Sequence, residues 1–322
     1  LEETAYDGSP RFHLFVAGAS SVAAARLILG LEHLISMDVS DGQSGAGWVF
    51  LNGATCSPWK DREGPFWLYE AYQLADSLCT TSVSVPLLWD TETHKIVSND
   101  CWEISKLISD ASSDLGFCSC PKNVLRVISK QGQHNSIPTL FPDDLKQDIE
   151  QMLKNNVEPL LDAVETGYEY LRNGKIETSL VLEGRTKVFA MLDKLEELLG
   201  NRSYLLDNLT GVDVRLAICL LQFDACYWGL FELQSSEKYR GPILTSDIYP
   251  NLKAYTREMY QLMKPAVYFE SFRQLYRLGQ AIEFTRDSYS CNGATSYKAL
   301  NRGNEEQLPD LHKIAAALEM PT

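Results

Sequence analysis

The chain has 322 residues, of which 45% are hydrophobic and 22% are charged, a composition typical of globular proteins large enough for two domains. Its 29 basic and 43 acidic residues give a formal net charge of −14, which argues against binding nucleic acid through phosphates and against attraction to anionic membranes. No uninterrupted apolar run approaches the roughly 20 residues of a membrane span, so we expect no direct span.

Eight cysteines are spaced too irregularly for a disulfide framework, and a chain of this size does not need one. We therefore expect reduced, mostly structural cysteines and a reducing compartment, such as the cytosol or an organelle stroma or matrix. The close pair Cys118 and Cys120 has no second ligand pair at zinc spacing, so we predict no metal site. The first residue is Leu1, not Met, which allows for a removed targeting peptide.

The first third of the chain reads as a layered α/β domain. Alternation over Arg11–Ala17 predicts a strand, Val22–Leu31 predicts a helix, and Leu34–Val39 predicts a second strand. Asp41–Asp76 is a long insertion rich in glycine and aromatic residues, for which we expect a functional or packing loop. Together these elements form a β-α-β start, which is typical of α/β proteins.

Two further strands and a helix complete this domain. Ser82–Trp89 reads as a strand that contains Pro86, and Ile96–Val97 reads as a short final strand. Ser98, Asn99 and Asp100 can cap a helix that continues to about Ile108. We therefore assign residues 1–111 to an α/β domain with an insertion at 41–76.

The remainder of the chain predicts an all-helical domain. Residues 112–142 lack periodicity and read as a linker, and residues 143–322 form the second domain. Apolar residues at three- and four-residue spacing predict six helices, over Leu145–Asn155, Val157–Arg172, Ile176–Leu199, Thr210–Glu232, Tyr249–Gln261 and Val267–Gln280. Glu283–Gln307 reads as a polar loop and Leu308–Glu319 as a short terminal helix.

Thr210 and Asp213 have the spacing of a capping box at the start of the fourth of these helices. Thr210 can bond the amide of Asp213, and the Asp213 carboxylate can accept from the amide of Thr210, which satisfies two otherwise unpaired donors. We interpret this pair as folding machinery.

Several motifs together resemble the glutathione transferase superfamily. They are Gly47-Trp48-Val49-Phe50, Val85-Pro86-Leu87-Leu88-Trp89-Asp90, Ile96-Val97-Ser98-Asn99-Asp100, Thr210-Gly211-Val212-Asp213 and Gln222-Phe223-Asp224. More narrowly, the chain resembles the glutathionyl-hydroquinone reductases of the xi and omega-like class. The resemblance covers about Arg11 to Gly279. It implies an N-terminal thioredoxin-like domain followed by a C-terminal helical bundle.

In the resembling family a catalytic cysteine follows the first strand, within a Cys-Pro-Trp-Ala-x-Arg motif at a helix start. Here Ser20 occupies the cysteine position, and Ser21, Val22 and Ala25 replace the proline, the tryptophan and the basic residue. A hydroxyl cannot form a mixed disulfide, so we expect no cysteine-type reductase chemistry at this site. Ser20 then either caps the helix or, like the serine of other transferase classes, stabilises a glutathione thiolate.

The resemblance also implies residues for binding glutathione. Val85 and Pro86 would present the backbone edge that pairs with the cysteinyl part, with Pro86 in the cis form, and Trp48 would line the site. Asp100 and Cys101 replace the family's Glu-Ser pair at the γ-glutamyl group, and Tyr69 replaces an arginine, which weakens the expected site. Tyr168 or Tyr170 and Tyr276 lie where the family places the tyrosines of its second-substrate pocket.

Three functional hypotheses follow. In the first, the chain has lost reductase chemistry and is a structural or interaction subunit with a protein partner, and a homodimer is one form of such a partnership. In the second, it is a transferase that uses Ser20 or Ser21. In the third, it is a thiol reductase with a displaced cysteine, Cys56 or Cys101.

Overall fold

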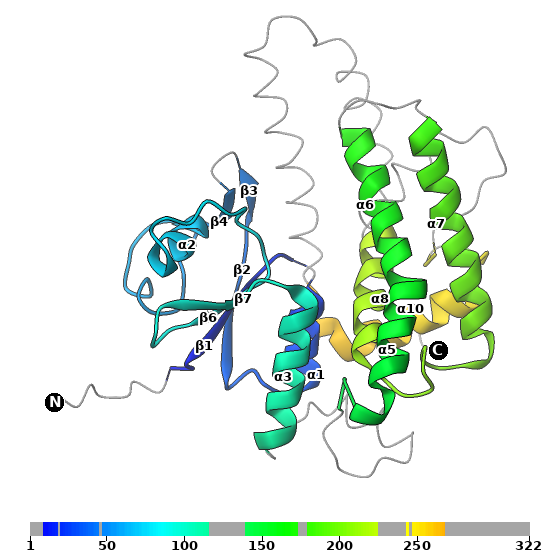
Figure 1. Ribbon diagram of the computed structural model, residues 1–322, viewed down its shortest axis with the longest axis horizontal. Coiled ribbons are helices and arrows are strands. Elements are labelled where there is room, and N and C mark those ends of the chain that lie inside the picture. Colours follow the sequence, from blue (N-terminus) through cyan, green and yellow to red (C-terminus); the bar gives the residue numbers. More distant parts are fainter. Residues whose placement is uncertain are drawn as a thin grey trace, which may run out of the picture. The chain divides into compact units, whose positions relative to one another are not determined.

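The computed structural model describes residues 9–18, 20–44, 47–115, 139–172, 179–224, 243–244 and 247–267. The chain divides into two compact units, which are treated separately below. Residues 1–122 with 265–282 form the first, called here the sheet unit, and residues 123–264 with 283–322 form the second, the helical unit. Figure 1 labels the elements of both.

A four-stranded mixed sheet in the order β2-β1-β6-β7 forms the centre of the sheet unit. Strand β1 pairs in parallel with β2 and antiparallel with β6, and β6 pairs antiparallel with β7. The elements are β1 Phe12–Val16, α1 Ser21–Ile28, β2 Ile35–Val39, β6 Leu87–Asp90, β7 Lys95–Ser98 and α3 Cys101–Leu115. Helices α1 and α3 pack against each other, so both bring their first turns to one end of the unit.

The predicted insertion has structure of its own, which sequence reasoning did not foresee. It contains a second, antiparallel sheet in the order β3-β4-β5, followed by a helix. Its elements are β3 Gly42–Ser44, β4 Gly47–Phe50, β5 Phe66–Trp67 and α2 Tyr69–Ala75. The segment is therefore a packing element of the domain rather than an unstructured loop.

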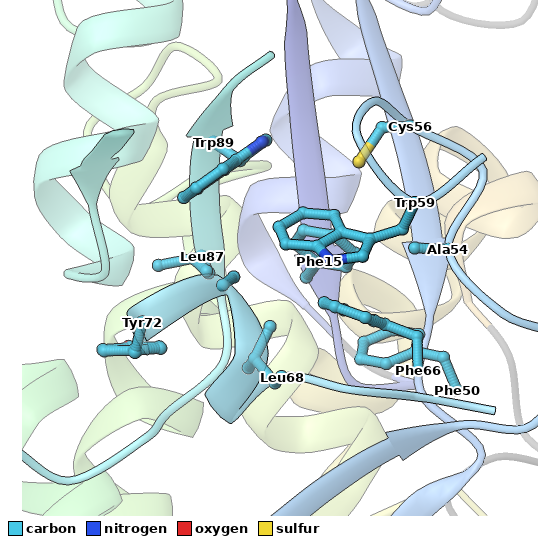
Figure 2. Close-up of a cluster of buried hydrophobic side chains, with 11 residues drawn as sticks. Phe15, Phe50, Ala54, Cys56, Trp59, Phe66, Leu68, Tyr72, Leu87 and Trp89 are labelled. Atoms are coloured by element: carbon cyan, nitrogen blue, oxygen red, sulfur yellow. The ribbon is translucent and has the colours of Figure 1, made fainter. Parts of the chain in front are cut away.

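An aromatic cluster joins this insertion to the central sheet (Figure 2). Phe15 of β1 and Trp89 of β6 meet Phe50, Trp59 and Phe66 of the insertion, with ring centroids of neighbouring pairs 4.7 to 6.4 Å apart. Tilted and edge-on aromatic pairs of this kind add to the stabilisation from burial. The cluster explains why a segment of this length can fold onto the sheet.

Two boundaries differ from the prediction in the sheet unit. Pro86 lies immediately before β6 and not inside a strand, because proline cannot donate to the sheet ladder. Helix α3 extends to Leu115 and therefore enters the predicted linker, whose residues 116–138 lie outside the described part of the chain.

The helical unit confirms the expected all-helical character for the residues described. Helix α6 packs against α7, and α8 packs against α5 and α10. The α-helices are α5 Lys146–Met152, α6 Glu158–Arg172, α7 Ser179–Leu198, α8 Gly211–Gln222 and α10 Pro250–Met263. Single turns adjoin them at η1 Asp143–Leu145, η2 Leu153–Val157, η3 Leu199–Asn201 and η5 Lys264–Ala266.

The other predictions for this half fall partly or wholly outside the description. Of the helix predicted over Val267–Gln280, only Val267 is described, and it is not helical; the rest of this helix and the tail elements lie outside the described residues. Of the helices that are described, none is both long and apolar enough to cross a membrane.

A buried carboxylate organises the start of α8. The capping box predicted from Thr210 and Asp213 is present. One Asp213 oxygen accepts from the amide and hydroxyl of Thr210, at 2.9 and 2.8 Å. The other accepts from the amide of Leu205 at 2.8 Å and from the hydroxyl of Tyr255 at 3.2 Å. Asp213 therefore links the helix start to the preceding turn and to α10.

Candidate functional site

Helix α1 begins where the family motif would place its cysteine. Ser20 is the N-cap residue, with an extended backbone, and its hydroxyl accepts a hydrogen bond from the amide of Ala23 at 3.4 Å. The Ser20 side chain is buried, with the residue 6% exposed. Its hydroxyl is thus used as a helix cap, a role that serine fills well.

Ser21 joins the starts of two helices. Its hydroxyl oxygen lies 3.0 Å from the Cys101 sulfur, at the first residue of α3. Ser21 is buried, whereas Cys101 is partly exposed and belongs to no disulfide. Among the described residues, Cys101 is therefore the thiol that lies beside the cysteine position of the family motif.

The start of α3 is closed by its own hydrogen bonds, as the sequence predicted. The Asp100 carboxylate accepts from the amide of Glu103 at 2.7 Å, which makes Asp100 the cap of this helix. Ser98 accepts from the Asp100 amide at 3.1 Å and donates to Glu103 at 2.6 Å. One Asp100 oxygen therefore serves the helix, and the residue is exposed.

The peptide bond between Val85 and Pro86 is cis, which confirms the expectation from the resemblance. Val85 is half-buried and packs against the aromatic cluster. Ser57–Pro58 is a second cis bond in the described residues.

The remaining predicted residues are spread over the structure. Trp48 lies in β4 and packs against the same aromatic cluster as Val85, and Tyr69 is the first residue of α2. Tyr168 lies in α6 and belongs to the helical unit, and Tyr276 lies outside the described residues. The other site residues predicted from sequence all belong to the sheet unit: Ser20, Ser21, Trp48, Val85, Pro86, Asp100 and Cys101. Of these, Ser21 and Cys101 are joined by a hydrogen bond between their side chains.

Cys56 does not fit the hypothesis of a displaced catalytic cysteine. Its side chain lies in the aromatic cluster, and burial, with the nearby Asp38 carboxylate, raises the pKa of its thiol far above the usual range. A thiol that stays protonated is a poor nucleophile. Of the two cysteines proposed, only Cys101 remains compatible with thiolate chemistry.

A chain of polar contacts runs from the buried His13 of β1 across β2 near this cluster. The His13 ring nitrogen Nδ1 lies 2.8 Å from the Ser36 hydroxyl, and Nε2 lies 3.2 Å from the Asp38 carboxylate. Asp38 in turn accepts from the amide and hydroxyl of Thr55, both at 2.7 Å. This chain anchors the insertion to the sheet. Within the described ranges, no three His, Cys, Asp or Glu side chains are grouped to hold a metal ion.

Comparison with known proteins gives consistent relatives. Residues 155–258 match the family model "Glutathione S-transferase, C-terminal domain". The glutathionyl-hydroquinone reductase YqjG of Escherichia coli is 32% identical over 277 residues, covering 83% of this chain and 74% of that protein. The glutathionyl-hydroquinone reductase PcpF of Sphingobium chlorophenolicum is 30% identical over 238 residues, covering 71% and 68%.

Solved structures agree. The glutathione-bound structure of YqjG from Escherichia coli matches with a TM-score of 0.67 at 29% identity, over 85% of this chain and 82% of that one. The xi glutathione transferase ECM4 of Saccharomyces cerevisiae, at 20% identity and a TM-score of 0.65, supports the fold.

Proposed function

Because this chain belongs to the glutathione transferase superfamily, in its xi and omega-like class, we propose that it binds glutathione in the sheet unit without reductase chemistry at Ser20 and acts as an interaction subunit. The observation that carries the proposal is the state of Ser20. Its hydroxyl is buried and accepts from the amide of Ala23 as a helix cap. A serine there cannot form the mixed disulfide that a cysteine would.

Glutathione binding is supported by what the site retains. The cis bond before Pro86, the half-buried Val85 and the capped start of α3 remain in place. YqjG, a relative with 32% identity, has a glutathione-bound structure of the same fold. The changes to Asp100, Cys101 and Tyr69 point to weaker binding than a site with Glu, Ser and Arg, because a bidentate guanidinium contact is lost.

The decisive experiment combines calorimetric titration of glutathione with a reductase assay on a glutathionylated hydroquinone. We expect heat of binding and no turnover by the wild-type chain. Conjugation of glutathione to a general electrophile that survives Cys101→Ser but is lost in Ser20→Ala or Ser21→Ala would support the serine-type transferase and contradict the proposal. Absence of any binding heat at millimolar glutathione would contradict its binding part.

A second candidate function, a thiol reductase that uses Cys101, rests on the 3.0 Å contact between Ser21 and Cys101. In this reading the Cys101 thiolate would attack the sulfur of the glutathionylated hydroquinone, which forms a disulfide between Cys101 and glutathione and breaks the bond between that sulfur and the ring carbon. The ring carbon would keep the electron pair of that bond, take a proton from water and leave as the hydroquinone. A second glutathione would then resolve the disulfide and leave as oxidised glutathione. Cys101→Ser should abolish any turnover, while the matched control Cys79→Ser, another partly exposed free cysteine, should leave it unchanged.

The interaction role is supported by the net charge of −14, which suits a partner with a basic surface. We expect complex formation that weakens as salt is raised, measured by sedimentation of the native complex against the purified chain. A chain that sediments as a monomer from its native source at low salt would contradict this role, and a self-associating chain would identify the partner as a second copy.

A further inference from the structure

Tyr72 stands out among the residues of the sheet unit that the proposed site does not use. It lies in α2 with its ring in the aromatic cluster (Figure 2), and the residue is 4% exposed. A buried tyrosine hydroxyl needs hydrogen-bond partners, and their positions show what it does.

The hydrogen-bond partners of the Tyr72 hydroxyl lie in two other segments of the chain, at Ser84 and at Asn99. The hydroxyl donates to the carbonyl of Ser84 at 3.3 Å and accepts from the amide of Ser84 at 3.4 Å. It also accepts from the side-chain amide of Asn99 at 3.1 Å. One donor and two acceptor positions are thereby used, which is the full capacity of a phenol.

Asn99 closes the same network from the other side. Its side-chain amide donates to the Tyr72 hydroxyl and also to the Ser84 hydroxyl, at 3.2 Å. Ser84 directly precedes Val85 and the cis bond to Pro86. Asn99 directly precedes Asp100, the cap of α3, and Cys101. The network therefore links the two segments that carry Val85 and Pro86 on one side and Asp100 and Cys101 on the other.

We propose that Tyr72 is a positioning residue, which through Asn99 and Ser84 holds the backbone edge at Val85 and Pro86 in register with the start of α3. The inference rests on the proposed function, because it takes bound glutathione to span these two segments. The cysteinyl part would lie on Val85 and Pro86, and the γ-glutamyl group on Asp100 and Cys101. Tyr72 does not itself contact the ligand. It fixes the distance between two contacts, and a ligand that uses both depends on that distance.

The first test removes only the hydroxyl and needs no ligand. In Tyr72→Phe the ring stays in the cluster, while the amide of Ser84 loses its acceptor. We expect hydrogen exchange of the Ser84 amide to accelerate about tenfold, with smaller increases at Asn99 and Asp100, since one hydrogen bond is worth about that factor. Tyr204→Phe is the matched control, because it removes another buried tyrosine hydroxyl, 3.3 Å from Glu258 in the helical unit. Unchanged exchange at Ser84 in Tyr72→Phe would overturn the proposal.

The second test asks whether the linkage positions the ligand. Tyr72→Phe should weaken binding of glutathione about fivefold to tenfold by calorimetry and leave that of cysteinylglycine, which lacks the γ-glutamyl group, unchanged. Tyr204→Phe should change neither. Equal losses for both ligands, or no loss for glutathione, would overturn the positioning role. If the wild-type chain binds no glutathione, the proposed function fails, and the exchange measurement alone decides whether Tyr72 holds the two segments together.

Discussion

Two helices of this chain begin at a buried hydroxyl cap, and the two starts differ in how many partners hold them. At α1, in the sheet unit, Ser20 accepts one recorded bond of 3.4 Å from Ala23. At α8, in the helical unit, the Asp213 carboxylate beside Thr210 is held by donors from Thr210, Leu205 and Tyr255. The start of α8 is tied through Asp213 to the preceding turn and to α10. At the start of α1 the bond of Ser20 stays within the helix, and the Ser21 hydroxyl bonds only to Cys101 of α3 among the described residues.

Buried carboxylates of the two units also differ, in the kind of partner that holds them. In the sheet unit, the bond from Arg11 is the largest influence holding the pKa of Asp90 well below its usual range. In the helical unit, burial raises the pKa of Asp213 to about 6 and that of Asp224 to about 7. Within the described part of the chain, Asp213 accepts from amides and hydroxyls, and Asp224 accepts from the amides of Ile243 and Leu244. The helical unit thus depends on buried carboxyl groups as internal caps, and the following changes test that dependence.

The largest effect is expected from Asp213→Ala. The substitution leaves the amides of Leu205 and Thr210 without their acceptor inside the core, while the hydroxyl of Tyr255 keeps the backbone carbonyl of residue 213, 3.1 Å away. We expect a loss of about 3–5 kcal/mol in the free energy of unfolding, measured by urea denaturation. The control Asp247→Ala removes a carboxylate whose side chain is 98% exposed and pairs with Lys253. It should change the free energy of unfolding by less than about 1 kcal/mol. Equal losses in the two variants would show that the buried bonds of Asp213 contribute no more than an exposed ion pair.

The next effect is a pH dependence centred on Asp224, whose oxygens accept from the amides of Ile243 and Leu244 at 2.9 and 2.6 Å. Its folded pKa of about 7 exceeds the ordinary value of 3.8, so the folded state binds this proton more tightly than the unfolded state. The contribution is therefore full below about pH 4 and is lost as the pH rises toward 7. From this group we expect a decline on the order of a few kcal/mol between pH 4 and pH 7.

Asp224→Asn provides the control for that decline, because its side chain does not titrate. Urea denaturation at intervals between pH 4 and pH 7 should give a flatter profile for Asp224→Asn than for the wild-type chain. Its stability should also be lower throughout, because an amide nitrogen cannot accept from the amide that faces it. Parallel profiles for the two proteins would show that Asp224 does not carry the pH dependence.

The features of the two units that depend on interactions between neighbouring residues could be predicted from the sequence. Thr210 and Asp213 stand three residues apart, so the capping box followed from spacing alone. Strand β1 followed from its alternation, α1 from its helix-forming residues, and β2 as a second short strand after it. The cis bond at Pro86 followed from the family resemblance.

The parts that could not be predicted depend on contacts between residues far apart in the chain. The insertion folds because Trp59 and Phe66 meet Phe15 and Trp89, a long-range packing that no local pattern encodes. For the same reason the sequence did not show that Cys56, one of the two cysteines considered for a displaced catalytic role, is part of the core. The linkage from Tyr72 to Ser84 and Asn99 likewise joins residues 12 and 27 positions apart.

Gly211→Ala tests how closely α8 approaches the segment before η1. A Cβ atom at Gly211 would lie 2.2 Å from the Phe141 ring, and the Gly211 amide donates to the carbonyl of Leu140 at 2.8 Å. Because ring and backbone must both move, we expect a loss of about 1–3 kcal/mol by thermal or urea unfolding. The control Gly200→Ala places its Cβ 3.6 Å from the Asn251 side chain, an ordinary contact, and should be nearly neutral. A neutral Gly211→Ala would show that α8 can shift without cost.

The smallest effect on stability is expected at Ser20, the N-cap residue of α1. Ser20→Ala removes one cap bond of 3.4 Å, so we expect a loss of about 0.5–1 kcal/mol in the free energy of unfolding. Thr210→Ala removes the hydroxyl that donates to Asp213 inside the core, and its loss should be nearer the upper end for cap residues, about 2 kcal/mol. If Ser20→Ala proved the more costly of the two, the start of α1 would contribute more to the free energy of unfolding than the single cap bond of Ser20 explains. The replacement of the family's cysteine by serine would then have to be understood as a gain in stability at that helix rather than as the loss of a reacting group.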